Sequence, residues 1–192
     1  MGRSARLAVS RAALGLAFAA VLAVLPACGG GGGGSPSEPP QPTPTATPAP
    51  GITVAVTTPQ GAAITLARGA RSTANLLVLE VRAESVAGLY GAAFDLQYPG
   101  MLLDYQARVP GPFLGANASV QVFESAPGTL VVGLSRLGNV PGVDGSGVLV
   151  ELELTPLAPG SGPLAFARNA ALGADGVEIQ MGWGSGTVSV SP

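Results

Sequence analysis

Apolar and polar residues alternate along much of the chain from residue 52 to residue 190. In residues 75–84, every second residue from Leu77 to Ala83 is aliphatic, and the intervening positions hold Val78 and charged residues. A period of two is that of a β-strand that buries one face. We therefore predict a strand here, with Leu77 and its alternates in a core and Val78 on the solvent side with the charges.

Two further segments show the same alternation. Residues 91–98 are predicted to bury Phe94 and its alternates and to expose Asp95. In residues 148–155, Leu149 is predicted to lie outside with the two glutamates. Less regular apolar segments complete the predicted strands: residues 52–56, 102–108, 119–124, 129–135, 164–172, 177–183 and 187–190.

Glycine and proline interrupt this pattern about every 8–12 residues, and no window has the period of a helix. Amphipathic strands at this spacing pack naturally as two facing antiparallel sheets. We predict one all-β domain over residues 51–192, an antiparallel β-sandwich of about nine strands. A domain of about 140 residues is long enough to bury about two thirds of the surface of its unfolded chain.

The N-terminal segment has a different composition. Three arginines lie within the first 11 residues, and residues 12–25 are almost entirely apolar. A positive start, a short apolar run and a small residue before the cut are typical of a secretory signal. The run is short for a membrane span, which takes about 20 residues.

Residues 25–28, Leu-Pro-Ala-Cys, resemble the lipobox of bacterial lipoproteins, although Pro26 departs from the usual pattern. The resemblance implies cleavage before Cys28, which leaves a signal peptide at residues 1–27 and a lipid on the Cys28 thiol. It also implies a lipid-anchored protein of the cell envelope, at the outer membrane or the cell surface, since Gly29 is not the aspartate of an inner-membrane retention signal. The alternative is an ordinary secretory signal that leaves a free thiol. Because Cys28 is the only cysteine, the chain forms no intramolecular disulfide.

Residues 28–50 are rich in glycine, proline and threonine, with six consecutive glycines before a proline-rich stretch. This composition cannot bury enough apolar surface to offset the entropy of ordering the chain, and its prolines favour the extended polyproline II conformation. We predict a disordered linker that separates the lipid anchor from the folded domain.

The chain has no histidine and no lysine, so that every basic residue is an arginine. From Cys28 onward, six arginines stand against eleven aspartates and glutamates, for a formal net charge of −5. A protein that binds nucleic acid needs a basic face, so we exclude that class of partner. Without histidine the chain can build neither a Ser-His-Asp triad nor an imidazole metal site, and we predict that it is not an enzyme.

Carboxylates offer two further possibilities. Glu151 and Glu153 could act as a pair in glycoside hydrolysis, but their place on the outer face of one predicted strand favours a solvated surface instead. Calcium would need several converging oxygens, and the Asp-Gly sequences at residues 144–145 and 175–176 are explained well as turns. We expect no cofactor, with calcium as the open alternative.

Exposed aromatic residues would favour carbohydrate binding, because planar rings can stack on sugars. Trp183, between two glycines, is the best candidate for exposure, followed by Tyr90 and Tyr105. Core packing is the alternative for Trp183, since a single tryptophan often fills the centre of a sandwich. Phe113, in the predicted loop 111–118, could present an apolar patch to a protein partner.

Four stretches of the domain resemble the cohesin domain, the jelly-roll sandwich that binds dockerin modules in cellulosomes. These stretches are residues 76–89, 91–103, 129–154 and 169–176. The resemblance implies a cohesin-like fold for the whole domain. Dockerin-binding members of the family have Asn and Asp at the positions of Gly91 and Ala93, and an acidic pattern in the region where this chain has Arg136. The resemblance therefore implies the fold but not cellulosomal dockerin recognition.

These observations favour a non-catalytic envelope lipoprotein that presents its sandwich to a protein partner, either dockerin-like or another envelope protein. One alternative is a polysaccharide-binding module that uses Trp183 and neighbouring tyrosines. A second alternative is a structural component of an envelope or secretion assembly, which would expose a strand edge to an obligate partner. The candidate binding residues are Trp183, Tyr90, Phe113 and Arg136.

Overall fold

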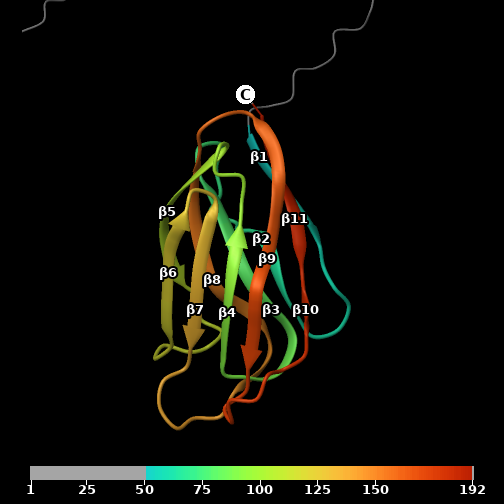
Figure 1. The fold of residues 1–192 in the computed structure, drawn as a ribbon, viewed down its shortest axis with the longest axis vertical. Coiled ribbons are helices and arrows are strands. Elements are labelled where there is room, and N and C mark those ends of the chain that lie inside the picture. The colour runs from blue at the N-terminus through green and yellow to red at the C-terminus, as the bar shows by residue number, and fades with distance from the viewer. Residues whose placement is uncertain (1–50, 192) are drawn as a thin grey trace, which may run out of the picture. The chain divides into compact units, whose positions relative to one another are not determined.

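The computed structural model describes residues 51–191, which form two packed β-sheets without a helix (Figure 1). Accordingly, none of these residues belongs to a helix long and apolar enough to cross a membrane. The predicted signal peptide, the predicted lipid attachment at Cys28 and the predicted linker 28–50 lie outside the described residues, as does Pro192.

The described part contains eleven strands in chain order. They are β1 (Gly51–Thr57), β2 (Ala63–Arg68), β3 (Leu77–Leu89), β4 (Gly91–Gln97), β5 (Leu103–Pro110), β6 (Ser119–Ala126), β7 (Thr129–Ser135), β8 (Val143–Pro156), β9 (Gly160–Leu172), β10 (Gly182–Trp183) and β11 (Ser185–Ser191). One sheet has the order β1-β11-β9-β4-β7-β6 and the other the order β10-β2-β3-β8-β5. Every strand pair is antiparallel except β10 with β2, so the predicted antiparallel sandwich is confirmed.

Two strand predictions need correction. Strand β2 lacks the expected alternation because Ile64, Thr65 and Leu66 are all buried, and the periodicity therefore did not reveal it. The predicted strand 177–183 is reduced to β10 and one isolated bridge between Leu172 and Glu178. The sandwich therefore has more strands than the predicted nine.

The core lies between the sheets and is built from the predicted alternates. Leu77, Leu79, Val81 and Ala83 of β3 are fully buried, as are Phe94 and Leu96 of β4. Phe94 also contacts two rings from other strands, with ring centroids 5.0 Å from Phe166 and 5.7 Å from Trp183. The core cluster includes buried residues of both sheets.

Three residues predicted to be exposed are buried instead. Leu149 is 1% exposed because the register of β3 with β8 shifts between the pairs Val81–Val150 and Arg82–Val148, which leaves it as an extra residue that turns into the core. Val78 points away from the core but is also 1% exposed, because the segment 69–72 covers it. Asp95, the third, is treated with the site below.

The chain enters and leaves the sandwich at one end, where Gly51 pairs with Ser191. The segments 111–118, 136–142 and 173–181 and the corner between β3 and β4 lie at the opposite end, at the bottom of Figure 1. Between these ends, strands β9, β4, β7 and β6 form a broad outer surface, which we call the groove face.

Candidate functional site

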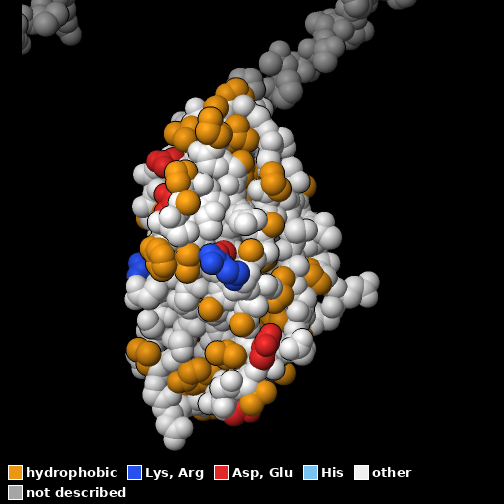
Figure 2. Space-filling view, viewed as in Figure 1, with side chains coloured by type: hydrophobic (Ala, Val, Ile, Leu, Met, Phe, Trp, Pro, Cys, Tyr) orange, Lys and Arg blue, Asp and Glu red, His pale blue; other side chains and the backbone are white. Residues whose placement is uncertain are grey.

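The groove face contains a hollow of about 470 Å³. It is lined mainly by glycine, alanine and other small or apolar residues of β4, β6, β7 and β9. Figure 2 views the molecule from this side and shows a surface with few charged side chains, among them a basic group near its centre. We call this hollow the groove.

The groove exists because small residues meet across three adjacent strands. Ala93 of β4 is paired with Gly133 of β7 on one side and with Ala170 of β9 on the other. A Cβ added to Gly133 would meet no atom within 4 Å, so the space above this glycine is open. Outward side chains stand roughly perpendicular to a sheet, and a row of small ones therefore leaves a depression.

The corner between β3 and β4 closes one end of the groove. Tyr90 donates its hydroxyl hydrogen to the carbonyl oxygen of Gly138 at 2.6 Å, and its backbone carbonyl accepts a bond from the Arg136 N–H at 2.9 Å. The next residue, Gly91, cannot carry a side chain, since an added Cβ would lie 2.7 Å from the carbonyl oxygen of Leu134. One side-chain and one backbone hydrogen bond thus fix Tyr90 against the loop that follows β7.

At the other end, the groove is bounded by a row of larger side chains. In register across the sheet, Phe123 of β6 is paired with Val131 of β7, Val131 with Asp95 of β4, and Asp95 with Ala167 of β9. The Phe123 side chain stands out, since this residue is 58% exposed. Phe123 and Val131 thus form an apolar border beside the groove.

Arg168 lies in the same region and binds Asp95. Its Nε donates to Asp95 Oδ2 at 2.7 Å, and its Nη2 donates to the same oxygen. The Arg168 side chain is 76% exposed, whereas that of Asp95 is only 9% exposed. Asp95 does point outward as predicted, but its neighbours and the arginine cover it, so the prediction of an exposed aspartate is wrong.

A β-bulge in β9 sets the position of Arg168. The partners of Ala93 and Asp95 on β9 are Ala170 and Ala167, so two residues of β9 oppose the single residue Phe94. Arg168 adopts a φ of 45°, in the left-handed region, which costs a non-glycine residue about 1–2 kcal/mol. The bulge therefore keeps a strained arginine on the groove face, beside the buried aspartate.

The structure brings together some of the predicted binding residues. Tyr90 lines the groove, and Arg136 follows directly on β7, where its side chain helps to line a small hollow of about 110 Å³ with the segment 114–117. Phe113 begins that same loop region but is partly buried against the core and packs on the backbone of Gly147. These three residues therefore gather at the loop end of the sandwich.

Trp183 does not join them. Its ring packs on the core side of the sheets, with centroids 5.2 Å from Phe166 and 5.7 Å from Phe94. The indole is thus engaged in aromatic packing, which is the core alternative considered for it above.

The opposite outer face, on the five-stranded sheet, has a different character. Arg71 bridges Glu151 and Glu153, at 3.2 Å from the latter, and Arg82 bridges Glu80 and Glu84 at 2.9 Å and 3.2 Å. Hydrogen bonds to these carboxylates raise the pKa of both arginines. The pair Glu151 and Glu153 is therefore held in ion pairs rather than facing an open site. We call this surface the charged face.

The two Asp-Gly sequences cap loops. Asp144 accepts a hydrogen bond from the Gly88 N–H at 2.6 Å, and Asp175 accepts one from the Val177 N–H at 3.0 Å. Within residues 51–191, no three His, Cys, Asp or Glu side chains come together as a metal-binding group. Both aspartates have a local structural role.

Comparison with solved structures identifies the fold. The cohesin CaCohA2 of Clostridium acetobutylicum superposes with a TM-score of 0.56 at 16% identity, over 68% of this chain and 91% of that one. The sixth cohesin of scaffoldin B of Acetivibrio cellulolyticus, solved with a dockerin, gives a TM-score of 0.55 at 15% identity over 68% and 98%. The described domain has the cohesin fold.

A non-cellulosomal cohesin of the archaeon Archaeoglobus fulgidus shares the fold too, with a TM-score of 0.50 at 17% identity over 70% of this chain and 87% of that one. No protein-family model matches the sequence, and the curated proteins contain no match. The described domain thus shares its fold with known cohesins at sequence identities of 15–17%.

Sequence reasoning did not find the groove or the ion pair beside it. In the sequence, Ala93 stands out only as a departure from the cohesin pattern. No pattern marks Gly133, Ala170 or Arg168 as residues of a binding site. The available signal is the series Ala165, Ala167 and Ala170, but its spacing changes at the bulge, and its meaning depends on which strands are neighbours. These residues become neighbours only when the strands of the sheet pair.

Proposed function

We propose that the cohesin-like domain is a non-catalytic protein-binding module and that the groove face is its binding surface. The groove supports this proposal, because an apolar depression beside an exposed aromatic ring and an arginine has the composition of a protein-binding hot spot. Gly91 and Ala93, which occupy positions where the cohesin resemblance implies partner contacts, both line it. The groove therefore lies where the sequence resemblance implies partner contacts.

The groove and the solved cohesin complexes also bear on the class of partner. Some of the similar cohesins were solved in complexes with dockerins, which supports a dockerin-like partner. This chain offers small residues where polar contacts to dockerin are expected, so its partner must fill a hollow rather than meet an Asn and an Asp. We propose a protein of the cell envelope or of the secreted fraction, dockerin-like or otherwise.

The predicted location completes the proposal. If Cys28 carries a lipid, residues 28–50 would connect the envelope membrane to Gly51, at the end of the sandwich opposite the loops. Within the described domain, the groove lies toward the loop end, where β4 begins, and so at a distance from Gly51. The polysaccharide alternative has less support, because its best residue, Trp183, packs against two core rings.

Substitution in the groove tests the binding surface. Gly133→Leu fills the groove without a steric clash at its Cβ, and it removes a glycine from a strand, which does not destabilise the sheet. Arg71→Leu adds the same side chain to the charged face and is the matched control. The intact protein, tagged at its C-terminus and held in mild detergent, is mixed with the secreted and envelope fractions of its own cells.

We expect wild type and Arg71→Leu to retain the same protein and Gly133→Leu to lose it. Retention that EDTA abolishes would indicate a calcium-dependent, dockerin-like partner, and retention in EDTA would indicate another envelope partner. Undiminished retention by Gly133→Leu would refute the groove face as the binding surface. Retention of polysaccharide in place of protein would favour the carbohydrate alternative.

A further inference from the structure

Arg168 is the one basic residue in β4, β6, β7 and β9, the strands that form the groove face. The acidic residues of these strands are Asp95, which lies beneath the arginine, and Glu124. Glu124 already accepts hydrogen bonds from the Tyr98 hydroxyl and from the Gly128 N–H, at 2.5 Å and 3.2 Å. The Arg168 side chain, which is 76% exposed, is therefore a cation available to a partner on this face.

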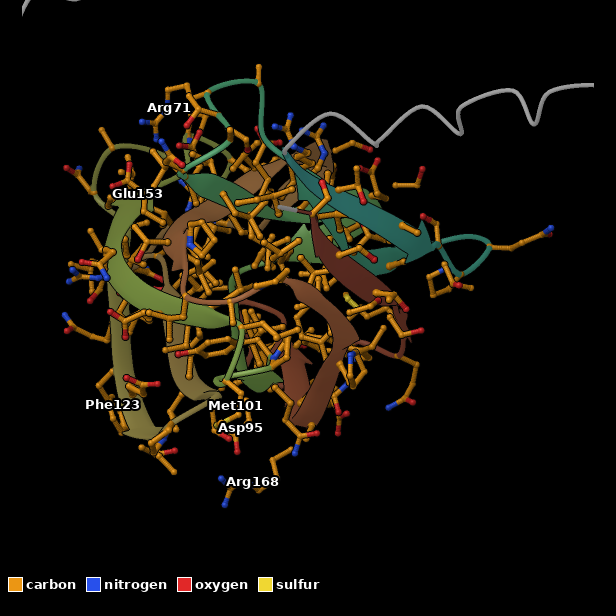
Figure 3. The ribbon with its side chains drawn as sticks, turned by 90° about the horizontal axis from the view of Figure 1, so that it is seen from above. Arg71, Asp95, Met101, Phe123, Glu153 and Arg168 are labelled. Atoms are coloured by element: carbon orange, nitrogen blue, oxygen red, sulfur yellow. The ribbon has the colours of Figure 1, made fainter. Side chains whose placement is uncertain are left out.

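The Arg168 guanidinium keeps unused donors. Nε and Nη2 both serve one oxygen of Asp95, and Nη1 has no hydrogen-bond acceptor among residues 51–191. Figure 3 shows Arg168 projecting beyond Asp95, on the side of the molecule away from Arg71 and Glu153. Asp95 thus orients the guanidinium and leaves its outer edge free for a second carboxylate.

The spacing between the cation and the groove limits the partner further. Ala93, on the groove floor, and Asp95, below Arg168, are two residues apart on β4, which corresponds to about 7 Å. Side chains two apart on a strand, or one turn apart on a helix, have a similar separation. A single partner segment can therefore contact both features.

We propose that the partner presents an acidic side chain to Arg168 and, two residues away on a strand or one turn away on a helix, an apolar side chain to the groove. This inference rests on the proposed function and adds the chemistry of the recognised segment. The occupant is a segment of another protein, chosen by charge complementarity to Arg168 and by the size of the groove. A neutral aliphatic or a basic segment would leave Nη1 of Arg168 without an acceptor.

A peptide library tests this chemistry without knowledge of the partner. The intact protein is immobilised through a C-terminal tag and used to select from a random twelve-residue peptide library displayed on phage, at low salt. We expect the selected peptides to carry Asp or Glu two to four positions from Ala, Val or Leu. For a resynthesised peptide, Arg168→Gln should weaken binding about tenfold or more, and Arg71→Gln should change it less than about twofold.

A charge reversal gives the sharpest outcome. The double variant Asp95→Asn with Arg168→Glu should select peptides with Lys or Arg in place of Asp or Glu. The double variant Asp95→Asn with Arg168→Gln removes both charges and should behave as Arg168→Gln does, even if the single variant is unstable. Circular dichroism melting curves establish that each variant folds.

The failures of the two proposals are distinguishable. Peptides without acidic bias, or peptides lost in Gly133→Leu but unaffected by Arg168→Gln, would overturn the acidic partner and leave the groove face as the binding surface. Peptides lost in neither variant, or no enrichment at all, would overturn both. Self-association in analytical ultracentrifugation that Gly133→Leu abolishes would identify a second copy as the occupant and also overturn the acidic partner.

Discussion

The two outer faces of the cohesin-like domain use charge in opposite ways. On the charged face, each arginine is shared between two glutamates, and Glu80 stands directly opposite Glu151 in the register of β3 and β8. On the groove face, one arginine projects above one buried aspartate, beside a row of small residues. On the charged face, two arginines thus form ion pairs with all four glutamates, whereas the groove face buries the anion of its ion pair and exposes the cation.

This difference identifies the face that is suited to a partner. Exposed ion pairs in water contribute little stability and are costly to desolvate, so a surface covered with them is well suited to remain in contact with solvent. An apolar hollow beside an exposed arginine gains more from being covered. We therefore propose that one face stays in solvent and the other binds a partner, and variants placed in pairs on the two faces can test the distinction.

The largest expected effect concerns two outward valines. Val78, on the charged face, is 1% exposed beneath the segment 69–72, whereas Val131, on the groove face, is only partly buried. Val78→Ala should lower the free energy of unfolding by about 2 kcal/mol or more, from lost transfer energy and a residual cavity. Val131→Ala should lower it by less than about 1 kcal/mol. Urea unfolding of both variants measures the difference; equal losses would mean that the segment 69–72 does not cover Val78 in solution.

The next effect compares one arginine from each face. Arg168→Ala leaves the buried Asp95 carboxylate without its partner, and should lower the free energy of unfolding by about 1–3 kcal/mol. Arg71→Ala should leave it unchanged within error, because the Arg71 side chain is more than half exposed and solvent screens its ion pairs. Thermal and urea unfolding measure both variants. An unchanged free energy of unfolding in Arg168→Ala would contradict this prediction, because another group would then have to stabilise the buried Asp95 carboxylate.

The fold was predictable because its main signal is local. Leu77, Phe94 and their alternates each identify a strand and its buried face through a period of two, and the structure confirms both. Ile64 to Leu66 escaped because burial on both faces erases that period. Leu149 was misplaced because a bulge is a property of two paired strands and has no period of its own.

The groove and its arginine were not predictable for a related reason. Ala93, Gly133 and Ala170 come from three strands and form a row only in the order β9-β4-β7. A single small outward residue predicts nothing, and sequence alone does not place these three side by side. No sequence pattern indicates the bulge in β9, which places Arg168 above Asp95.

A smaller effect, confined to alkaline pH, compares one tyrosine from each sheet. Burial, followed by the hydrogen bond to Glu124, raises the pKa of Tyr98, and burial alone raises that of Tyr105. Because the folded-state pKa is raised, the unfolded chain releases this proton first as the pH rises above about 10. The stability contributed by Tyr98 should therefore be complete below pH 10 and decline above it. Urea midpoints measured between pH 8 and pH 11.5 should fall less steeply in Tyr98→Phe than in wild type. Tyr105→Phe should change the slope less than Tyr98→Phe does. A Tyr98→Phe profile identical to that of wild type would contradict the prediction.

The smallest expected effect lies wholly on the charged face and concerns its dependence on salt. Arg82 separates Glu80 from Glu84 along β3, so Arg82→Gln leaves two glutamates that repel each other and the nearby Glu151. At low ionic strength the loss of stability should be about 0.5 kcal/mol, in the range of partly exposed ion pairs. At 1 M salt the Debye length is about 3 Å, so the loss should nearly vanish.

Arg168→Gln should keep most of its loss of stability in the same salt, because Asp95 is buried and salt screens a buried charge far less. Unfolding curves of both variants at low and high salt decide the point, because a cost that disappears for both would place the two arginines in the same solvated environment and remove the distinction between the faces.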